Sequence, residues 1–193
     1  MEYRRQTVTE QAMQSEWREI QQAQVNPAAF RGLYDRYYEP IFRFVFRRTT
    51  DERLTADLCS QVFLKALQRL KSYQFRGVPF SAWLYRIAAN EVNQHYREAG
   101  KNRIVSIEDR ALYEMSDELE DDRAFSIEDM VAQIAQLKPA DVEILELRFF
   151  EGRPFKEVAE ILEITESNAK VRTYRVLERL KKLMLRASQT QNQ

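Results

Sequence analysis

The stretch of sequence that decides the fold is FKEVAEILEITESNAKVRTYRVLERLKKL, residues 155–183. Its first eight residues place their apolar side chains on one face, which predicts a short helix at 155–162. A tight turn at 163–165 follows, and Thr165 is a suitable N-cap for a longer helix that begins at Glu166. The apolar face of this longer helix consists of Ala169, Thr173, Val176, Leu177, Leu180 and Met184.

The other face of the longer helix is polar and basic, because bases outnumber acids between Thr165 and Arg186. A short helix, a tight turn and a longer helix with a basic outer face form the layout of a helix-turn-helix. The second helix of this motif enters the major groove of DNA. The pattern favours DNA binding, and the alternative is an ordinary basic surface helix in an α-helical bundle.

The remainder of the chain is also predicted to be helical. Only 4 Gly and 5 Pro occur in 193 residues, and 44% of the residues are hydrophobic, which favours long helices around a packed core. An apolar stripe from Phe30 to Val45 predicts a helix, with Asn26 as its cap and Pro27 in its first turn. Pro40 lies inside this stripe, so we expect a kink or a break there.

Three further helices are expected in the first half of the chain. A narrow stripe through Met13, Trp17 and Ile20 marks the first of them. The other two span about 53–70 and 81–97, and the loop Tyr73–Pro79 lies between them. In the last of these helices we expect Trp83, Ile87 and Ala88 to face the core.

The segment from Ser106 to Asp129 is strongly acidic, and its apolar residues are sparse and aperiodic, which is typical of a linker. The helical pattern resumes at Ser126 and continues, with a stop at Lys138-Pro139, to about Phe150. The predicted fold class is therefore all-α, with two small helical domains joined by an acidic flexible linker. The expected boundaries are 14–98, 99–125 and 126–186.

Several classes of function find no support in the sequence. The single Cys59 excludes an internal disulfide and a multi-cysteine zinc site, and it fits a cytoplasmic protein. No signal peptide or membrane-spanning segment is found. We find no catalytic triad, phosphate-binding glycine loop or metal-ligand cluster, so we expect no catalytic residue, metal, cofactor or small-molecule substrate. His95 is interpreted as a surface or DNA-flanking residue.

Longer stretches of the chain resemble a known family. LKPADVEILELRFFEGRPFKEVAEILEITESNAKVRTYRVLERLKKL (137–183) resembles region 4 of bacterial sigma factors. AFRGLYDRYYEPIFRFVFRR (29–48), ADLCSQVFLKAL (56–67) and FRGVPFSAWLYRIAANEVNQHYR (75–97) are similar to region 2. Their order resembles the extracytoplasmic-function (ECF) subgroup, from about Gln14 to Leu185. The resemblance implies initiation at promoter DNA together with core RNA polymerase, through its β′ clamp and β flap, and control by an anti-sigma factor.

The resemblance assigns core polymerase binding to one helix. The residues concerned are Asp57, Leu58, Ser60, Gln61, Phe63 and Leu64. Phe63 and Leu64 would be its apolar anchors, and the alternative for Phe63 is an ordinary place in the core. Ser60 and Gln61 stand where the family usually has Gln and then Glu.

The resemblance assigns recognition of the minus-ten element to the loop Tyr73–Pro79 and to the helix after it. Phe75 would stack on a base flipped from the non-template strand, and Arg76 would contact the backbone. Asn90, Gln94 and Arg97, at steps of four and three, form the helical face that would contact this element.

Recognition of the minus-thirty-five element is assigned to the C-terminal helix. Lys170, Tyr174 and Arg175 are the candidates for contacts with base edges. Ser167 and Asn168, at the start of the helix, would meet phosphate or bases, and Arg172 would meet phosphate. The rival function is a stand-alone helix-turn-helix regulator that does not dock on core polymerase.

Three hypotheses remain open for the acidic linker. It is a solvated spacer between two promoter-binding domains, or, as the resemblance implies, it follows the RNA exit path and mimics a transcript. In the third hypothesis it folds back on the basic helix and inhibits the free protein, so that deleting Glu114–Asp122 would tighten its DNA binding.

Overall fold

The chain divides into two compact units, each with a core of its own. The computed structural model describes residues 8–100, 109–118 and 127–191, and these residues form helices and no strand. Helices α1–α4 belong to the first unit. Helices α5–α7, the start of α8 and α9 belong to the second. The predicted all-α class is therefore confirmed, and the two units are described separately below.

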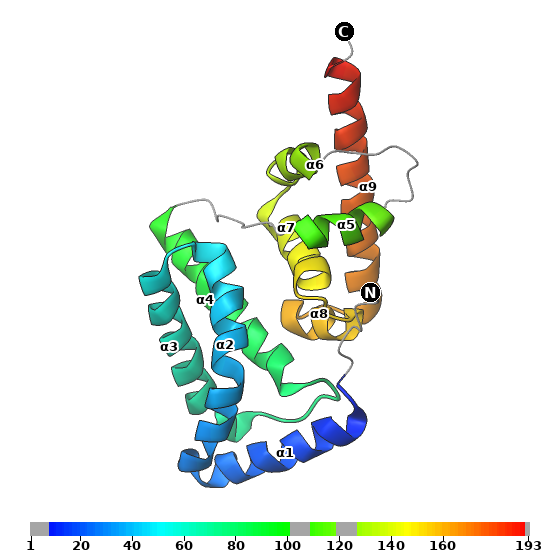
Figure 1. The fold of residues 1–193 in the computed structure, drawn as a ribbon. Coiled ribbons are helices and arrows are strands. Elements are labelled where there is room, and N and C mark those ends of the chain that lie inside the picture. Colours follow the sequence, from blue (N-terminus) through cyan, green and yellow to red (C-terminus); the bar gives the residue numbers. More distant parts are fainter. Residues whose placement is uncertain (1–7, 101–108, 119–126, 192–193) are drawn as a thin grey trace. The chain divides into compact units, whose positions relative to one another are not determined.

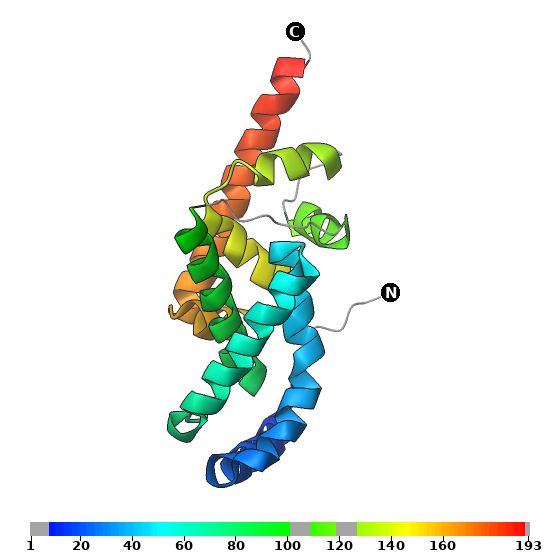
Figure 2. The same cartoon turned by 90° about the vertical axis from the view of Figure 1, so that its left-hand side faces the viewer.

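The first unit is a bundle of three helices crossed at one end by a fourth. Its elements are α1 (Glu10–Val25), a 3₁₀ turn (Pro27–Ala29), α2 (Phe30–Thr49), α3 (Glu52–Arg69), a second 3₁₀ turn (Leu70–Ser72) and α4 (Phe80–Ala99). Helices α2, α3 and α4 contact one another in every pair, and α1 lies across one end of them (Figures 1 and 2).

The predicted start of α2 is confirmed with one difference. The Asn26 side chain accepts a hydrogen bond of 3.1 Å from the Ala28 backbone N–H, so Asn26 is a cap. Pro27 begins a 3₁₀ turn, and the α-helix itself begins at Phe30. The fixed φ of proline suits either kind of first turn.

Helix α2 continues through Pro40 as one element, so the break that we considered there does not occur. Proline removes one backbone hydrogen bond, but the side chains that follow it, Ile41, Phe44 and Val45, are completely buried. Packing of an apolar face supplies most of the stability of a helix in a protein, and here it outweighs the lost bond. The helix ends at Thr49, and the residue that caps it, Thr50, has a left-handed backbone (φ 52°).

Aromatic rings fill the part of the first core that lies behind the loop Tyr73–Pro79. The Trp83 ring lies 4.8 Å from that of Tyr73 and 5.3 Å from that of Phe80, measured between centroids. Trp83 is only 7% exposed, and Ile87 and Ala88 are buried beside it on α4. The predicted inward face of α4 is therefore confirmed.

The second unit packs short helices against one long helix. Its elements are α5 (Asp109–Glu118), α6 (Ile127–Ile134), α7 (Pro139–Leu145), a π-helical turn (Glu146–Phe150), α8 (Phe155–Leu162) and α9 (Glu166–Gln191). Helices α6 and α7 both contact α9 (Figure 1). All six residues of the predicted apolar face of α9 are buried, which confirms that prediction.

Helix α5 corrects our expectation of a flexible linker over 99–125. Leu112 and Met115, one helical turn apart, are both buried, and α5 contacts α6 and the π-helical turn. A single i, i+3 apolar pair is too short a pattern to stand out in the sequence, yet it suffices once a neighbouring element covers it. The remainder of the predicted linker, at 101–108 and 119–126, lies outside the described residues.

No helix in the described part of the chain is both long enough and apolar enough to span a membrane. Among the same residues, no three His, Cys, Asp or Glu side chains are grouped so that they could hold a metal ion.

Candidate nucleic-acid interface

Helices α8 and α9 and the turn between them form the predicted helix-turn-helix. The Thr165 hydroxyl accepts a hydrogen bond of 3.2 Å from the Asn168 backbone N–H, so its predicted role as N-cap of α9 is confirmed. Ser167 and Asn168 are exposed in the first turn of α9. Free N–H groups and the positive end of the helix dipole favour an anion at this position.

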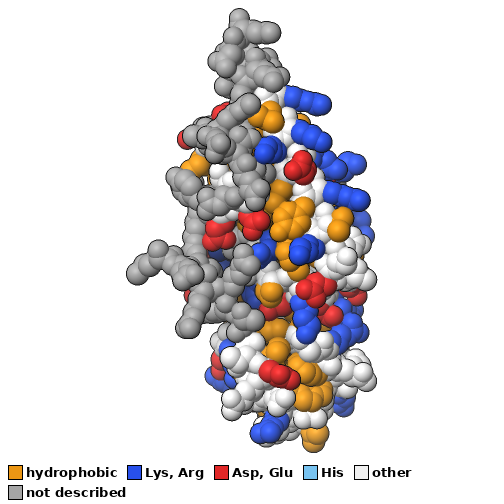
Figure 3. Space-filling model, turned by 90° about the vertical axis from the view of Figure 1, so that its right-hand side faces the viewer, with side chains coloured by type: hydrophobic (Ala, Val, Ile, Leu, Met, Phe, Trp, Pro, Cys, Tyr) orange, Lys and Arg blue, Asp and Glu red, His pale blue; other side chains and the backbone are white. Residues whose placement is uncertain are grey.

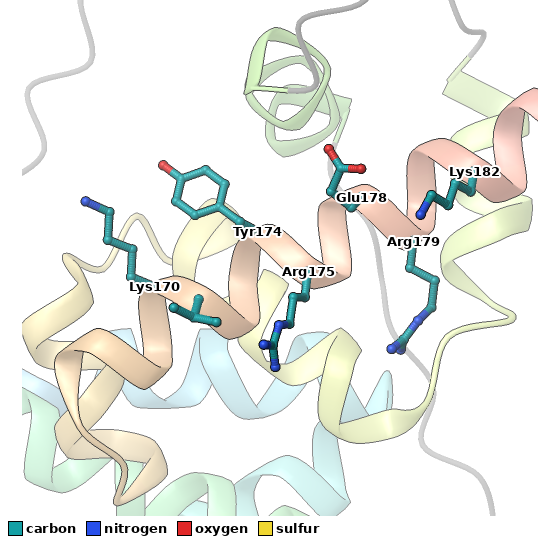
Figure 4. A pocket seen from close by; sticks show the side chains of 7 residues that line it. Lys170, Tyr174, Arg175, Glu178, Arg179 and Lys182 are labelled. Atoms are coloured by element: carbon teal, nitrogen blue, oxygen red, sulfur yellow. The ribbon is translucent and has the colours of Figure 1, made fainter.

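A shallow groove runs along the exposed face of α9. Its lining residues are Lys170, Val171, Tyr174, Arg175, Glu178, Arg179 and Lys182. Lys170 and Tyr174 extend to one side of the helix, whereas Arg175 and Arg179 extend to the other (Figure 4). Lys and Arg side chains gather over this part of the surface, with apolar side chains between them (Figure 3). The three predicted base-contacting residues therefore share one accessible, cationic face.

Two arginines of α9 have partners within the protein. The Arg172 guanidinium donates a hydrogen bond of 2.7 Å to the Ala140 carbonyl, and Arg179 forms an ion pair with Asp141. Both partners lie in the first turn of α7, so the two arginines tie α9 to α7. Arg172 thus has a structural role that the sequence did not predict, and its phosphate contact stays a prediction.

Val171 is a member of the groove that sequence reasoning missed. It is 45% exposed, next to Tyr174 at 42%. An apolar side chain in the major groove contacts the methyl group of thymine. Its signal in the sequence is its place off the apolar face of α9, among basic residues.

The minus-ten candidates lie on the loop Tyr73–Pro79 and on α4. The Phe75 ring is half-buried and stacks on Trp17 of α1, with 6.2 Å between centroids and 26° between planes. Asn90, Gln94 and Arg97 are all exposed on α4. The Gln94 side chain donates a 2.8 Å hydrogen bond to Glu98 on the same helix. This face is accessible, as the prediction requires.

Arg76 and His95 are the other two loop and α4 residues that the sequence singled out. Arg76 is exposed, as a contact with the DNA backbone requires. The His95 ring is half-buried and contacts Tyr96 edge to face, at 5.4 Å between centroids.

The candidate docking residues on α3 divide by exposure. Asp57, Ser60, Gln61 and Leu64 are exposed, whereas Leu58 and Phe63 are each only 4% exposed. The burial of Phe63 fits the alternative of an ordinary core residue, and its role as an apolar anchor stays a prediction. Helical spacing showed which residues share a face, but it did not show which face meets solvent.

Apolar side chains remain accessible at this surface. Leu64 is 56% exposed, Leu67 is 37% exposed and Tyr34 is 38% exposed. The Phe63 ring packs edge to face against the Tyr34 ring, with 4.8 Å between centroids. A shallow groove between α3 and the start of α2 is lined in part by Pro27, Phe30, Tyr34, Phe63, Leu64 and Leu67. Leu67 was not among the predicted residues, although it lies one turn after Leu64.

Both units match models of known families. Residues 33–102 match Sigma-70 region 2, and residues 127–180 match Sigma-70, region 4. The first range covers most of α2 and all of α3 and α4, and the second covers α6 to most of α9.

Whole relatives align over most of the chain. RNA polymerase sigma factor YlaC of Bacillus subtilis is 30% identical over 165 residues, which cover 82% of this chain and 94% of YlaC. ECF RNA polymerase sigma factor BldN of Streptomyces coelicolor is 29% identical over 169 residues, which cover 86% of this chain and 64% of BldN.

The fold is also similar to that of a solved sigma factor. RpoE of Bartonella quintana, in complex with the anti-sigma factor NepR, superposes with a TM-score of 0.55 at 19% identity, covering 80% of this chain and 96% of that one. With both regions matched in order and YlaC aligned over nearly its whole length, the chain belongs to the ECF subgroup of the sigma-70 family of RNA polymerase sigma factors.

Proposed function

We propose that this chain binds core RNA polymerase and directs transcription initiation at promoters that carry a minus-thirty-five and a minus-ten element. Its membership of the sigma family supports a role in transcription initiation. The observation that carries the proposal is the accessible cationic face of α9, on the second helix of a helix-turn-helix.

In this proposal α9 reads the minus-thirty-five element in the major groove. Lys170 and Arg175 donate hydrogen bonds to base edges. Tyr174, which lies between these two cations, also contacts base edges. Ser167 and Asn168 bind phosphate at the positive end of the helix. The exposed positions of all five side chains support these roles.

The first unit opens and holds the minus-ten element. Phe75 stacks on a base that leaves the duplex, because an aromatic ring compensates for the stacking that the base loses. Arg76, Asn90, Gln94 and Arg97 then bind the captured strand, and their exposure supports this role.

Core polymerase docks on α3 in this proposal. Leu64 and Leu67 form the apolar centre of the contact, and the polar side chains of Asp57, Ser60 and Gln61 surround it. A regulatory partner, an anti-sigma factor, binds the free protein, as NepR binds RpoE.

The test is a multi-round transcription assay with purified core polymerase, this protein and a library of genomic fragments. We expect protein-dependent transcript starts that share a pair of upstream elements. Lys170→Ala and Arg175→Ala should each weaken minus-thirty-five recognition by about 1–3 kcal/mol and relax the sequence preference. Lys182→Ala, on the same helix but further from its N-terminus, should weaken binding evenly across sequences.

A second arm separates this function from that of a stand-alone regulator. Leu64→Asp should abolish binding to core polymerase and all protein-dependent starts, while leaving the affinity of the free protein for duplex DNA unchanged. DNA binding without any protein-dependent start, in the wild-type chain, would contradict the proposal and identify a regulator that acts alone.

A further inference from the structure

The start of the loop Tyr73–Pro79 is fastened to α1 by one side chain. The Gln24 amide nitrogen donates hydrogen bonds to two carbonyls, that of Leu70 at 2.9 Å and that of Tyr73 at 2.8 Å. These carbonyls flank the 3₁₀ turn after α3, and the Leu70 carbonyl also accepts the 3.0 Å hydrogen bond from the Tyr73 backbone N–H that closes this turn. Gln24 therefore fixes the backbone at the point where the chain enters the loop.

The end of the loop is fastened to the same helix. Glu16 is only 7% exposed, and its carboxylate accepts a 3.1 Å hydrogen bond from the Phe80 backbone N–H. Phe80 is the first residue of α4, where a negative charge is favoured by the helix dipole. Tyr37 donates its hydroxyl to the same carboxylate. Burial and the charge of Glu16 raise the pKa of Tyr37, so this hydroxyl stays a donor.

The middle of the loop rests on a ring of α1. Trp17 lies 6.0 Å from Tyr73 and 6.2 Å from Phe75, measured between ring centroids, and its plane is close to parallel with that of Phe75. One face of Phe75 is thus supported by Trp17. The orientation of the ring that would receive a flipped base is set by a residue outside the loop.

We propose that α1 is a positioning element for strand capture, with Gln24 and Glu16 fixing the two ends of the loop and Trp17 orienting Phe75. Helix α1 (Glu10–Val25) precedes the region 2 match, which begins at residue 33, so the family model does not include it. A loop that is ordered before it meets DNA loses less conformational entropy on binding. This inference rests on the proposed function, since it concerns the same minus-ten contact.

The experiment uses the full chain assembled with core polymerase, at the promoter identified by transcription. Gln24→Glu keeps the size of the side chain but removes both N–H donors and places a charge near two carbonyls. Its matched control is Gln22→Glu, the same change at an exposed position of α1. The measurements are affinity for core polymerase, affinity for a single-stranded minus-ten oligonucleotide, permanganate reactivity of unpaired thymines, and affinity for a minus-thirty-five duplex.

We expect Gln24→Glu to lower the oligonucleotide affinity roughly tenfold, because two hydrogen bonds are lost, and to lower permanganate reactivity in parallel. Affinity for core polymerase and for the minus-thirty-five duplex should not change, and Gln22→Glu should resemble the wild type. Trp17→Leu, which keeps an apolar side chain but removes the ring, should give the same selective loss.

Unchanged oligonucleotide affinity in both Gln24→Glu and Trp17→Leu would overturn the proposal. An equal loss of affinity for core polymerase, which docks on α3 of the same unit, would overturn it too, because it would show that α1 only stabilises the first unit. Failure of the proposed function is distinguishable from either result, since the wild-type holoenzyme would then leave the promoter thymines unreactive.

Discussion

At the scale of single residues, burial raises the pKa of two groups in the first unit, Cys59 and Tyr73. Cys59 lies within α3 and is completely buried, and burial raises the pKa of its thiol from 9.0 to about 12. Burial, assisted by the charge of Glu16, raises the pKa of Tyr73 from 10.0 to about 12. Both groups therefore remain neutral at physiological pH, and Cys59 packs as a small apolar side chain.

Cys59 should be unreactive in the native protein. At pH 8 the raised pKa lowers the thiolate population by about a thousandfold relative to an unfolded chain, and burial hinders access further. We expect a chromogenic disulfide reagent to label Cys59 only after unfolding in urea. Cys59→Ala is the control for background colour. Labelling of the native protein at the rate of the unfolded one would contradict the assignment.

The raised pKa of Cys59 also makes the stability of the fold depend on pH. The folded state disfavours the Cys59 thiolate, so the unfolded state releases its proton at lower pH. The stability that this thiol contributes is fully present below pH 9 and is lost as the pH rises from 9 towards 12.

Single residues also show where sequence reasoning succeeds and where it stops. The cap at Thr165 is readable because its chemistry is local, between a hydroxyl and an N–H three residues away. The burial of Phe63 depends on which other element covers its face, and one chain segment does not contain that information. The bond from Arg172 to Ala140 joins residues far apart in sequence and has no local pattern.

At the scale of elements, the stability of α9 and its proposed contact with phosphate both depend on its first turn. Thr165 closes that turn, and the exposed residues next to it, Ser167 and Asn168, are the proposed anion contacts. Loss of the cap would loosen the backbone N–H groups that face the phosphate. Stability and DNA affinity are therefore linked at this helix end.

Thr165→Ala should lower the free energy of unfolding of the second unit by about 1 kcal/mol, because the Asn168 N–H loses its partner. Thr165→Asn, which retains an acceptor, should remain close to the wild type. Urea denaturation followed by circular dichroism measures the difference. Equal stability of the Ala variant would show that the cap observed here contributes nothing.

Elements also differ in how well the sequence predicts them. Helices α2, α4, α8 and α9 were predicted because each carries a sustained apolar stripe. Helix α5 was not, because its buried pair, Leu112 and Met115, is too short a pattern to stand out among the acidic residues around it. Its formation depends on tertiary contacts with α6 and the π-helical turn, which no local pattern encodes.

At the scale of the whole molecule, the chain has two separate cores. Ile41 is completely buried in the first unit and Leu180 is completely buried in the second. The two-domain organisation was predictable, because the acidic segment interrupts the apolar periodicity. The boundaries at 98–99 and 125–126 stay predictions.

We expect the two units to unfold in separate transitions. Ile41→Ala and Leu180→Ala should each cost about 2–5 kcal/mol, and each should shift only the transition of its own unit. Differential scanning calorimetry of the full chain measures both transitions together. One cooperative transition that moves with either substitution would show that the units are energetically coupled.

The left-handed residue at the end of α2 has an evolutionary consequence. Thr50 is β-branched and occupies a left-handed backbone region that glycine enters without strain. For Thr50 this conformation costs about 1–2 kcal/mol of stability. Thr50→Gly would relieve this strain, so the chain does not carry the least strained residue at this position, as expected when selection holds stability above a threshold rather than at a maximum. The stability that this substitution restores would offset a later destabilising substitution at the DNA-facing surface.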